Sequence, residues 1–479
     1  MEKLVRQHIW QSEDPEIRPS EKFAEEALLK ASLYFEDVDQ QLSRRRKDLK
    51  NKIIDGQGSW EDRVELNVIE QERAMVTVRW LEYGLCVDRD NIWNMWNDLY
   101  TRVRRGKKFE LVEQMLQVAE KTPIGVKDRR PFIERLTEDQ LIEHKLKRVT
   151  NQREIGNLND AKLELETMLR LYATNSSLKA TILNQLGVVY RDLGDYEKAL
   201  KHQEECFKMI MDTEQKNWWA IANVQNQLGF LYRLLEDKNN EALDLAEKHY
   251  IAAIDAISKY KESLSGQKQQ ASVVDAKIHI SMLLATIMTN LGYIEGLKKN
   301  YQGGYDLLSS SVKMWQDAGR EREVARAETT VGILKRDEAR FDEALEVMET
   351  AIERLHYPDD ASQMSVTYFH YGWTQWFKAE ELGLDTAEGI NLLRAAKQNL
   401  EDALDFAYEK ELEREKPGIL HQLATVTWRL GFRTKNDELM ASARSINKQA
   451  IDESIRLDNM RYLIDAYTGE GEFDLDILD

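Results

Sequence analysis

The residues of this sequence best suited to chemistry are asparagines and arginines that recur at one spacing. Asn184 is followed by Arg191, and Asn226 by Arg233, each time seven residues later. Residues seven apart lie on one stripe of an α-helix. An asparagine side chain can bond both the donor and the acceptor of an extended peptide, and an arginine can hold a carboxylate through two parallel hydrogen bonds. Such a stripe could grip an acidic or C-terminal peptide segment.

Later segments carry related residues at corresponding positions. Arg336 repeats the arginine, and Trp373, Trp376 and Trp428 place aromatic rings where they could anchor an apolar side chain. A solvated stripe paired with neighbouring acids is the alternative for the polar residues, and core packing is the alternative for the tryptophans. The predicted partner-binding residues are Asn184, Arg191, Asn226, Arg233, Arg336, Trp373 and Trp376.

Motifs for catalysis or metal binding are missing from the sequence. There is no His-Glu-x-x-His, Cys-x-x-Cys or Gly-x-Ser-x-Gly segment. Cys86 and Cys206 are too few for a disulfide framework or a cysteine zinc site, and we interpret Cys206 as a packed small residue. We therefore predict a protein that is not an enzyme and needs no cofactor or metal.

The composition favours a helical, water-soluble protein. The 479 residues include 6 prolines and 23 glycines, 32% of residues are charged, the mean hydropathy is −0.58 and the net charge is −18. So few turn residues exclude collagen-like and many-turned all-β proteins, and the negative charge argues against a nucleic-acid partner. No run of about 18 apolar residues and no apolar N-terminal signal occurs, so we expect a cytoplasmic protein without membrane contact.

A repeat organises the central part of the chain. Five similar segments share a glycine, and successive glycines are 42, 63, 40 and 40 residues apart. The long interval indicates an insertion, which we place at residues 258–272. Weaker copies occur around Gly156 and around Leu423-Ala424, where alanine replaces the glycine. The shared glycines are Gly187, Gly229, Gly292, Gly332 and Gly372.

The spacing within each copy predicts a helical hairpin. A small residue beside a large apolar one lets two antiparallel helices approach closely, and Gly194-Asp195 supplies the turn. Leu186-Gly187-x-x-Tyr190 and Gly194-Asp195-Tyr196-x-x-Ala199-Leu200 resemble the tetratricopeptide repeat, although the interval near 40 exceeds that family's usual 34 or so. This resemblance implies an all-α solenoid, a right-handed superhelix in which the first helix of each hairpin lines a concave surface that binds a protein or peptide partner.

We expect three regions. Residues 1–140 form an N-terminal helical domain with a helix from Phe23 to about Lys52, residues 141–460 form the repeats, and residues 461–479 form an acidic C-terminal tail. The tail alternates acidic and apolar residues and is opposite in sign to the arginines. It could therefore occupy the arginine stripe until a partner displaces it.

The N-terminal third also resembles a segment of bacterial signal-transduction NTPases that carry a helical-repeat sensor. The segment Tyr34-Phe35-Glu36-Asp37-Val38-Asp39, Trp93, Tyr100 and the stretch 102–109 carry this likeness. The chain departs from those proteins because it has no Gly-x-x-x-x-Gly-Lys-Ser/Thr phosphate loop. We predict a non-catalytic scaffold or sensor in a bacterial regulatory or defence assembly. The alternatives are the repeat arm of a nucleotide-driven switch and a subunit that regulates an effector enzyme such as a protease.

Overall fold

The computed structural model consists of α-helices joined by short turns, with one 3₁₀ turn, over all the residues it describes, so the predicted all-α class is confirmed. The described residues are 21–54, 65, 69, 72–73, 76–81, 92–105, 109–121, 132–172, 174–235, 240–264, 271–356, 360–409, 412–413, 415–457, 462–469 and 473.

Contacts divide the chain into two compact units, and the boundary follows Glu164. The first unit contains the long helix that we predicted from Phe23, observed as α2 (Glu21–Ile54). Its best-described core lies between α4 (Ile92–Arg105) and α5 (Phe109–Lys121), where Trp96, Leu99 and Met115 are fully buried. A 3₁₀ turn, η2 (Phe132–Arg135), leads to α6 (Glu138–Glu154), which begins with a capping box at Thr137. The predicted boundaries at residues 140 and 460 stay predictions.

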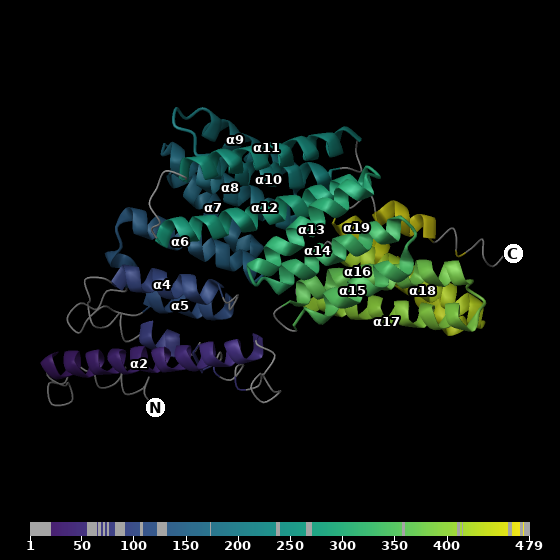
Figure 1. The fold of residues 1–479 in the computed structure, drawn as a ribbon, viewed down its shortest axis with the longest axis horizontal. Helices are drawn as coiled ribbons and strands as arrows, with labels where there is room; N and C mark the ends of the chain where they lie inside the picture. Colours follow the sequence, from purple (N-terminus) through teal and green to yellow (C-terminus); the bar gives the residue numbers. More distant parts are fainter. Residues whose placement is uncertain are drawn as a thin grey trace. The chain divides into compact units, whose positions relative to one another are not determined.

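The second unit, from Leu165 to the C-terminus, is a series of helical hairpins (Figure 1). In each hairpin an even-numbered first helix packs against the odd-numbered second helix that follows it, and neighbouring first helices also touch one another. α7 (Leu158–Leu171) precedes these hairpins. Their helices are α8 (Ser176–Leu193), α9 (Tyr196–Met211), α10 (Trp218–Leu234), α11 (Asn240–Leu264), α12 (Ala271–Leu297), α13 (Tyr301–Asp317), α14 (Glu321–Asp337), α15 (Phe341–Glu353), α16 (Ala361–Leu382), α17 (Ala387–Glu409), α18 (Lys416–Thr434) and α19 (Asp437–Arg456).

The shared glycines lie where the two helices of a hairpin meet, as predicted. A Cβ atom at Gly187 would come within 2.5 Å of Gln203 on α9, and one at Gly229 within 2.8 Å of the Tyr250 ring on α11. Leu308, Met348 and the backbone of Ala396 are equally near the three later glycines. Real Cβ atoms essentially never come closer than 3.0 Å to a neighbour, so a larger residue at these positions would require the facing side chain or helix to shift.

Polar residues in the turns within and between hairpins start the helices. Asn175, Asp195, Asn217, Asn300 and Asn436 each accept a hydrogen bond from the backbone N–H three residues later. Gly194 ends α8 with a left-handed φ of 78°, which places Asp195 at the start of α9. The predicted turn therefore depends on both residues: Gly194 reverses the chain after α8, and Asp195 caps α9.

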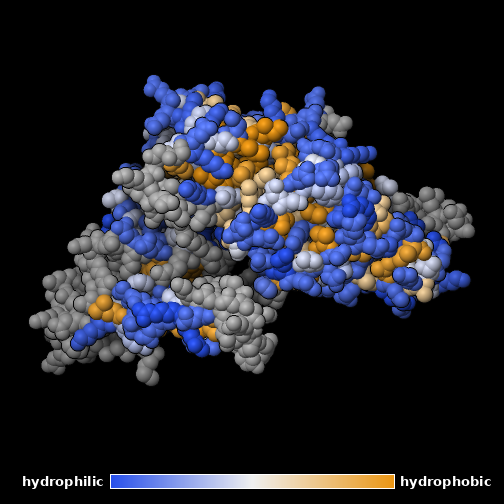
Figure 2. Space-filling model, in the orientation of Figure 1, coloured by the Kyte–Doolittle hydropathy of each residue, from blue (hydrophilic) through white to orange (hydrophobic). Residues whose placement is uncertain are grey.

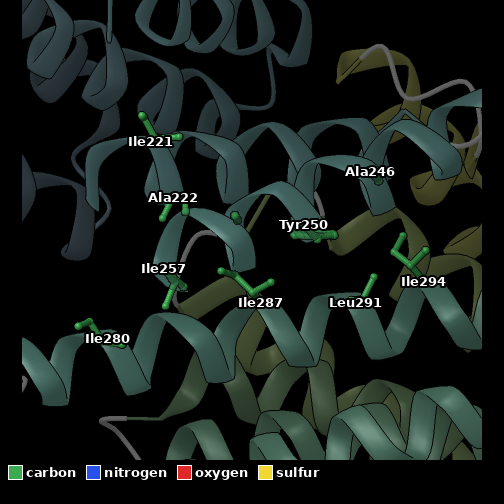
Figure 3. Close-up of a cluster of buried hydrophobic side chains, with 11 residues drawn as sticks. Ile221, Ala222, Ala246, Tyr250, Ile257, Ile280, Ile287, Leu291 and Ile294 are labelled. Atoms are coloured by element: carbon green, nitrogen blue, oxygen red, sulfur yellow. The ribbon is translucent and has the colours of Figure 1, made fainter. Parts of the chain in front are cut away.

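The extra residues between the second and third shared glycines lengthen the helices α11 and α12. α11 has 25 residues and α12 has 27, so the described parts of the predicted insertion at 258–272 continue these helices. Side chains of α10, α11 and α12 meet in one apolar cluster that includes Ile221, Tyr250 and Ile287 (Figure 3). In the described chain, His279–Leu297 of α12 is long and apolar enough to cross a membrane by length and composition alone, but half of this window is buried inside the protein.

Apolar side chains also reach the surface of the second unit. Leu245 and Ile251 of α11 are 38% and 53% exposed. Figure 2 shows apolar atoms gathered in the region that α11 and α12 occupy in Figure 1, with hydrophilic atoms around them.

Candidate partner-binding face

The predicted arginines lie on a face built by the first helices, and each contacts the next hairpin. Arg191 of α8 donates a 2.8 Å hydrogen bond to the side-chain oxygen of Gln227 on α10, and its guanidinium lies 5.1 Å from the centroid of the Phe230 ring. It also pairs with Asp192, the next residue, at 2.5 Å. Arg191 is thus half-buried and partly neutralised.

Arg233 of α10 has aromatic neighbours instead of an acid. Its guanidinium carbon lies 4.7 Å from the centroid of the Phe230 ring and 5.1 Å from that of Tyr293 on α12. Within the described structure, no carboxylate is in salt-bridge distance of Arg233, and its buried Nε has no hydrogen-bond partner. Among the described residues its charge is therefore surrounded by aromatic rings, with Tyr250 also near enough to interact with it, and not by a carboxylate.

Arg336 of α14 is held more tightly. It pairs with Asp337 at 2.9 Å, lies 3.4 Å from Nδ1 of His370 on α16 and stacks 4.3 Å from the Trp373 ring centroid. Only 7% of its side chain is exposed. Burial, and after it the charge of Arg336, lowers the pKa of His370 to about 3, so the imidazole is neutral at pH 7.

These contacts follow a rule that connects neighbouring copies. The arginine four residues after the shared glycine stacks on the aromatic residue that directly follows the glycine of the next copy. Where the arginine is replaced by Gly296, the next copy has Ile333 in place of the aromatic residue. The arginine and its ring are therefore present together or absent together, which identifies the pair as a connection between hairpins.

Arg326 of α14 belongs to the same face, although the sequence analysis missed it. Its side chain is exposed and donates a 3.1 Å hydrogen bond to Asn290 on α12. Surrounding protein and the charge of Arg233 nevertheless lower its pKa to about 10, and Arg191 and Arg322 contribute in the same direction. Arginines of α8, α10 and α14 thus lie near enough to one another for their charges to affect the pKa of Arg326.

The predicted asparagines lie deeper than the arginines. Asn226 is only 6% exposed, and Asn184 is half-buried. The Oδ1 atoms of both are buried without a hydrogen-bond partner. The corresponding Thr329 is buried too and bonds Thr367 of α16 at 3.0 Å. The asparagine stripe thus runs along the helix contacts beneath the arginines.

The two predicted tryptophans differ in position. Trp373 contacts Arg336 and also lies near His370 and Phe377, so it belongs to the arginine-bearing face. Trp376 packs against the apolar cluster between α16, α17 and α18. The indole N–H groups of both are buried without a partner. The structure therefore brings Trp373 to the arginines and leaves Trp376 in the core.

Reactive groups are not assembled at this face. In the described chain, no group of three or more His, Cys, Asp or Glu side chains could hold a metal ion. Cys206 is fully buried and donates to the Ala180 carbonyl at 3.1 Å, and burial raises the pKa of its thiol to about 12. Its placement agrees with the interpretation of a packed small residue.

Comparison with known proteins identifies the repeats. The tetratricopeptide repeat family model matches residues 178–255, which span α8, α9, α10 and most of α11. Among curated proteins none matches. Similar solved structures include a Rap protein complexed with competence and sporulation factor (11% identity, 86% of this chain and 99% of that chain, TM-score 0.48) and the apo quorum sensor NprR from B. thuringiensis (13%, 87% and 99%, 0.46). The apo form of RapI is also similar (10%, 90% and 98%, 0.42). With its glycine-centred hairpins, the chain is an all-α helical-repeat protein of the tetratricopeptide type.

Proposed function

We propose that this protein is a non-catalytic binding scaffold or sensor whose first-helix face takes an acidic segment, or a C-terminal carboxylate, of a protein or peptide partner. The observation that carries the proposal is the convergence of Arg233 and Arg326. Both are on the first-helix face, and in the described chain neither has a carboxylate in salt-bridge distance. A partner carboxylate would fill that place.

Electrostatics supports an anionic ligand at this position. The whole chain has a net charge of −18, yet desolvation by the surrounding protein, followed by the charges of Arg233, Arg191 and Arg322, lowers the pKa of Arg326 here. A bound carboxylate would relieve the repulsion among these arginines. Phe230 and Tyr293 hold Arg233 in position, which reduces the conformational entropy lost on binding.

Fluorescence anisotropy with defined peptides tests the proposal. The probes are labelled Glu/Asp-rich decapeptides with a free C-terminal carboxylate, their C-terminally amidated forms and Lys-rich counterparts. We expect the acidic peptides to bind and the Lys-rich ones not to bind. Arg233→Gln with Arg326→Gln should weaken binding about tenfold or more, because hydrogen bonds to charged groups contribute about 1.5–3 kcal/mol each. Arg191→Ala with Arg233→Ala should abolish capture.

Arg394 provides a matched control. It is an exposed arginine of α17, a second helix, and like Arg326 it donates one hydrogen bond to an asparagine, here Asn391 at 3.0 Å. Arg394→Gln should leave binding unchanged. Equal binding by the Arg233/Arg326 double variant and the wild type would refute the proposal, as would an equal loss with Arg394→Gln.

The setting of this function is part of the same proposal. We place the protein in the cytoplasm, in a bacterial regulatory or defence assembly. The free buried thiol of Cys206 supports a reducing compartment. The likeness of the N-terminal helices to sensor-bearing NTPases supports the assembly. Affinity purification from the native host, followed by mass spectrometry, should recover an acidic or carboxylate-ended partner, and loss of that partner from the Arg233/Arg326 variant would connect it to this face.

A further inference from the structure

The C-terminal segment covers an aromatic surface on the last described hairpin. Phe473 is 2% exposed, and its ring stacks on that of Trp428, with centroids 4.6 Å apart and planes 18° from parallel. Trp428 is itself buried and shares an apolar cluster with Ala424 of α18 and Ala443 of α19. The sequence analysis expected the tail to meet the arginine stripe, whereas its aromatic residue lies on α18 and α19.

A short helix brings Phe473 to this place. Residues 462–469 are helical, and the fully buried Ala466 packs with Leu420 of α18 and Ala450 of α19. Nδ2 of Asn447 donates a 2.9 Å hydrogen bond to the carbonyl oxygen of Ala466. The segment is thus anchored by a helix first and by the phenylalanine ring next.

Trp428 has a specific place in the repeat. Ala424 replaces the shared glycine in α18, so Trp428 stands four residues after it, where three earlier copies have Arg191, Arg233 and Arg336 and the other two have Gly296 and Trp376. Those arginines stack on an aromatic residue of the following first helix. Among the described residues no further hairpin follows α19, and Phe473 supplies the ring. The Trp428 surface is therefore a repeat-to-repeat contact that a separate segment can complete.

A positive charge beside the Trp428 ring adds a second criterion for a ligand of this surface, namely negative charge. Residues 470–479 around Phe473 contain five acidic residues and no basic one. The guanidinium of Arg444, on α19, lies 5.1 Å from the Trp428 ring centroid. An acidic segment with an aromatic anchor matches both the ring and the positive charge.

We propose that the Trp428 surface is a second binding site, for an acidic partner segment anchored by an aromatic residue, and that the chain's own Phe473 occupies it until the partner segment displaces it. The site depends on α18 and α19 and is independent of the function assigned to the arginine-bearing face. A tethered occupant acts at an effective concentration in the millimolar range, so displacement requires a partner with higher affinity or high local concentration.

Competition by a labelled peptide with the sequence of residues 469–479 tests the proposal in the full-length protein. We expect Phe473→Ala to bind this peptide about tenfold or more tightly than the wild type, because the tethered competitor is removed. Adding Trp428→Ala to that variant should abolish binding. A peptide in which alanine replaces the phenylalanine should not bind. Should Phe473→Ala lose its helical circular dichroism, Phe473→Leu, which has no ring to stack, takes its place.

Three results would overturn the proposal. The first is that the wild type and the folded Phe473 variant bind the peptide equally well, or that neither binds it. The second is equal binding of the phenylalanine and alanine peptides, which would mean attraction by charge alone. The third is loss of peptide binding when Arg233→Gln and Arg326→Gln are added to Phe473→Ala. This third result would place the acidic peptide on the arginine-bearing face and so support the proposed function while removing the second site.

Discussion

Replacing Gly229 by alanine tests the steric basis of the hairpins. The new Cβ would lie 2.8–3.0 Å from three carbon atoms of the Tyr250 ring, whereas ordinary carbon contacts are about 3.5–4.0 Å. Tyr250 is fully buried among side chains of α10, α11 and α12, so the ring cannot turn away freely. The two helices must separate or the ring must leave its preferred rotamer.

The expected loss of stability follows from two opposing effects. Overpacking of a core site costs about 1–3 kcal/mol, and alanine in place of glycine within a helix gains about 1 kcal/mol. We therefore expect Gly229→Ala to lower the free energy of unfolding by about 1 kcal/mol. Urea denaturation followed by far-ultraviolet circular dichroism measures this change, and hydrogen exchange should show faster opening of α10 and α11 than of the last hairpin.

Making Gly229→Ala in a Tyr250→Leu protein separates the steric clash with the Tyr250 ring from other effects of the substitution. In a Tyr250→Leu protein the crowding ring atoms are gone, so Gly229→Ala should become neutral or stabilising. The sixth copy supports this expectation, because Ala424 stands at the glycine position there and packs with Ala443. The steric argument fails if Gly229→Ala stabilises the wild-type protein, or if its effect is the same in the wild-type and the Tyr250→Leu backgrounds.

Three further changes probe other parts of the structure. The pKa of His370 is about 3 in the folded protein and about 6.5 when unfolded, so its contribution to stability is full above pH 6.5 and is lost as the pH falls toward 3. From pH 7 to pH 5 the wild type should therefore lose about 2 kcal/mol of unfolding free energy that the His370→Gln protein does not lose. Urea denaturation of both proteins at the two pH values measures this difference. In a Cys86→Ser background, Cys206 should react with a thiol reagent at pH 8 only after unfolding, because its pKa is raised to about 12; rapid labelling of the native protein would contradict this. The Lys147 ammonium lies 5.1–5.4 Å from three aromatic ring centroids, so Lys147→Gln should destabilise the N-terminal unit by about 1–2 kcal/mol, and an unchanged melting curve would show that these contacts contribute little.

The hairpins could be predicted from the sequence because their cause is local. Gly187 and the four later glycines recur at intervals of 40 or 42 residues except across the insertion, and each meets a second helix that begins shortly afterwards. The turn at Gly194-Asp195 was equally visible, because one residue needs a left-handed φ and the next must cap a helix.

The candidate face was predicted only in part, because it depends on how the hairpins stack. Arg191 and Arg233 were found by their interval of seven residues. Arg326 lies six residues before the shared Gly332, outside the stripe that was considered, and its importance comes from arginines of other helices. Asn226 follows the predicted interval yet is buried, since a periodic pattern does not reveal whether a stripe faces solvent or the next helix. The Phe473 contact joins distant residues, so no interval indicates it.

One contact geometry connects the two proposed sites. Between hairpins, an arginine of one first helix stacks on a ring of the next, and this contact fixes how successive hairpins join. At Trp428 the partners are two rings, and the second comes from a separate segment. Arg233 has no carboxylate in salt-bridge distance among the described residues. The first proposal, an anionic ligand on this face, is based on that unbalanced positive charge. Trp428 has the ring of Phe473 and the cation of Arg444 beside it, and the sequence around Phe473 is acidic, so the second proposal is for an aromatic anchor flanked by acids. Both proposals are for acidic segments, and they differ in whether a carboxylate alone or an aromatic ring as well is required.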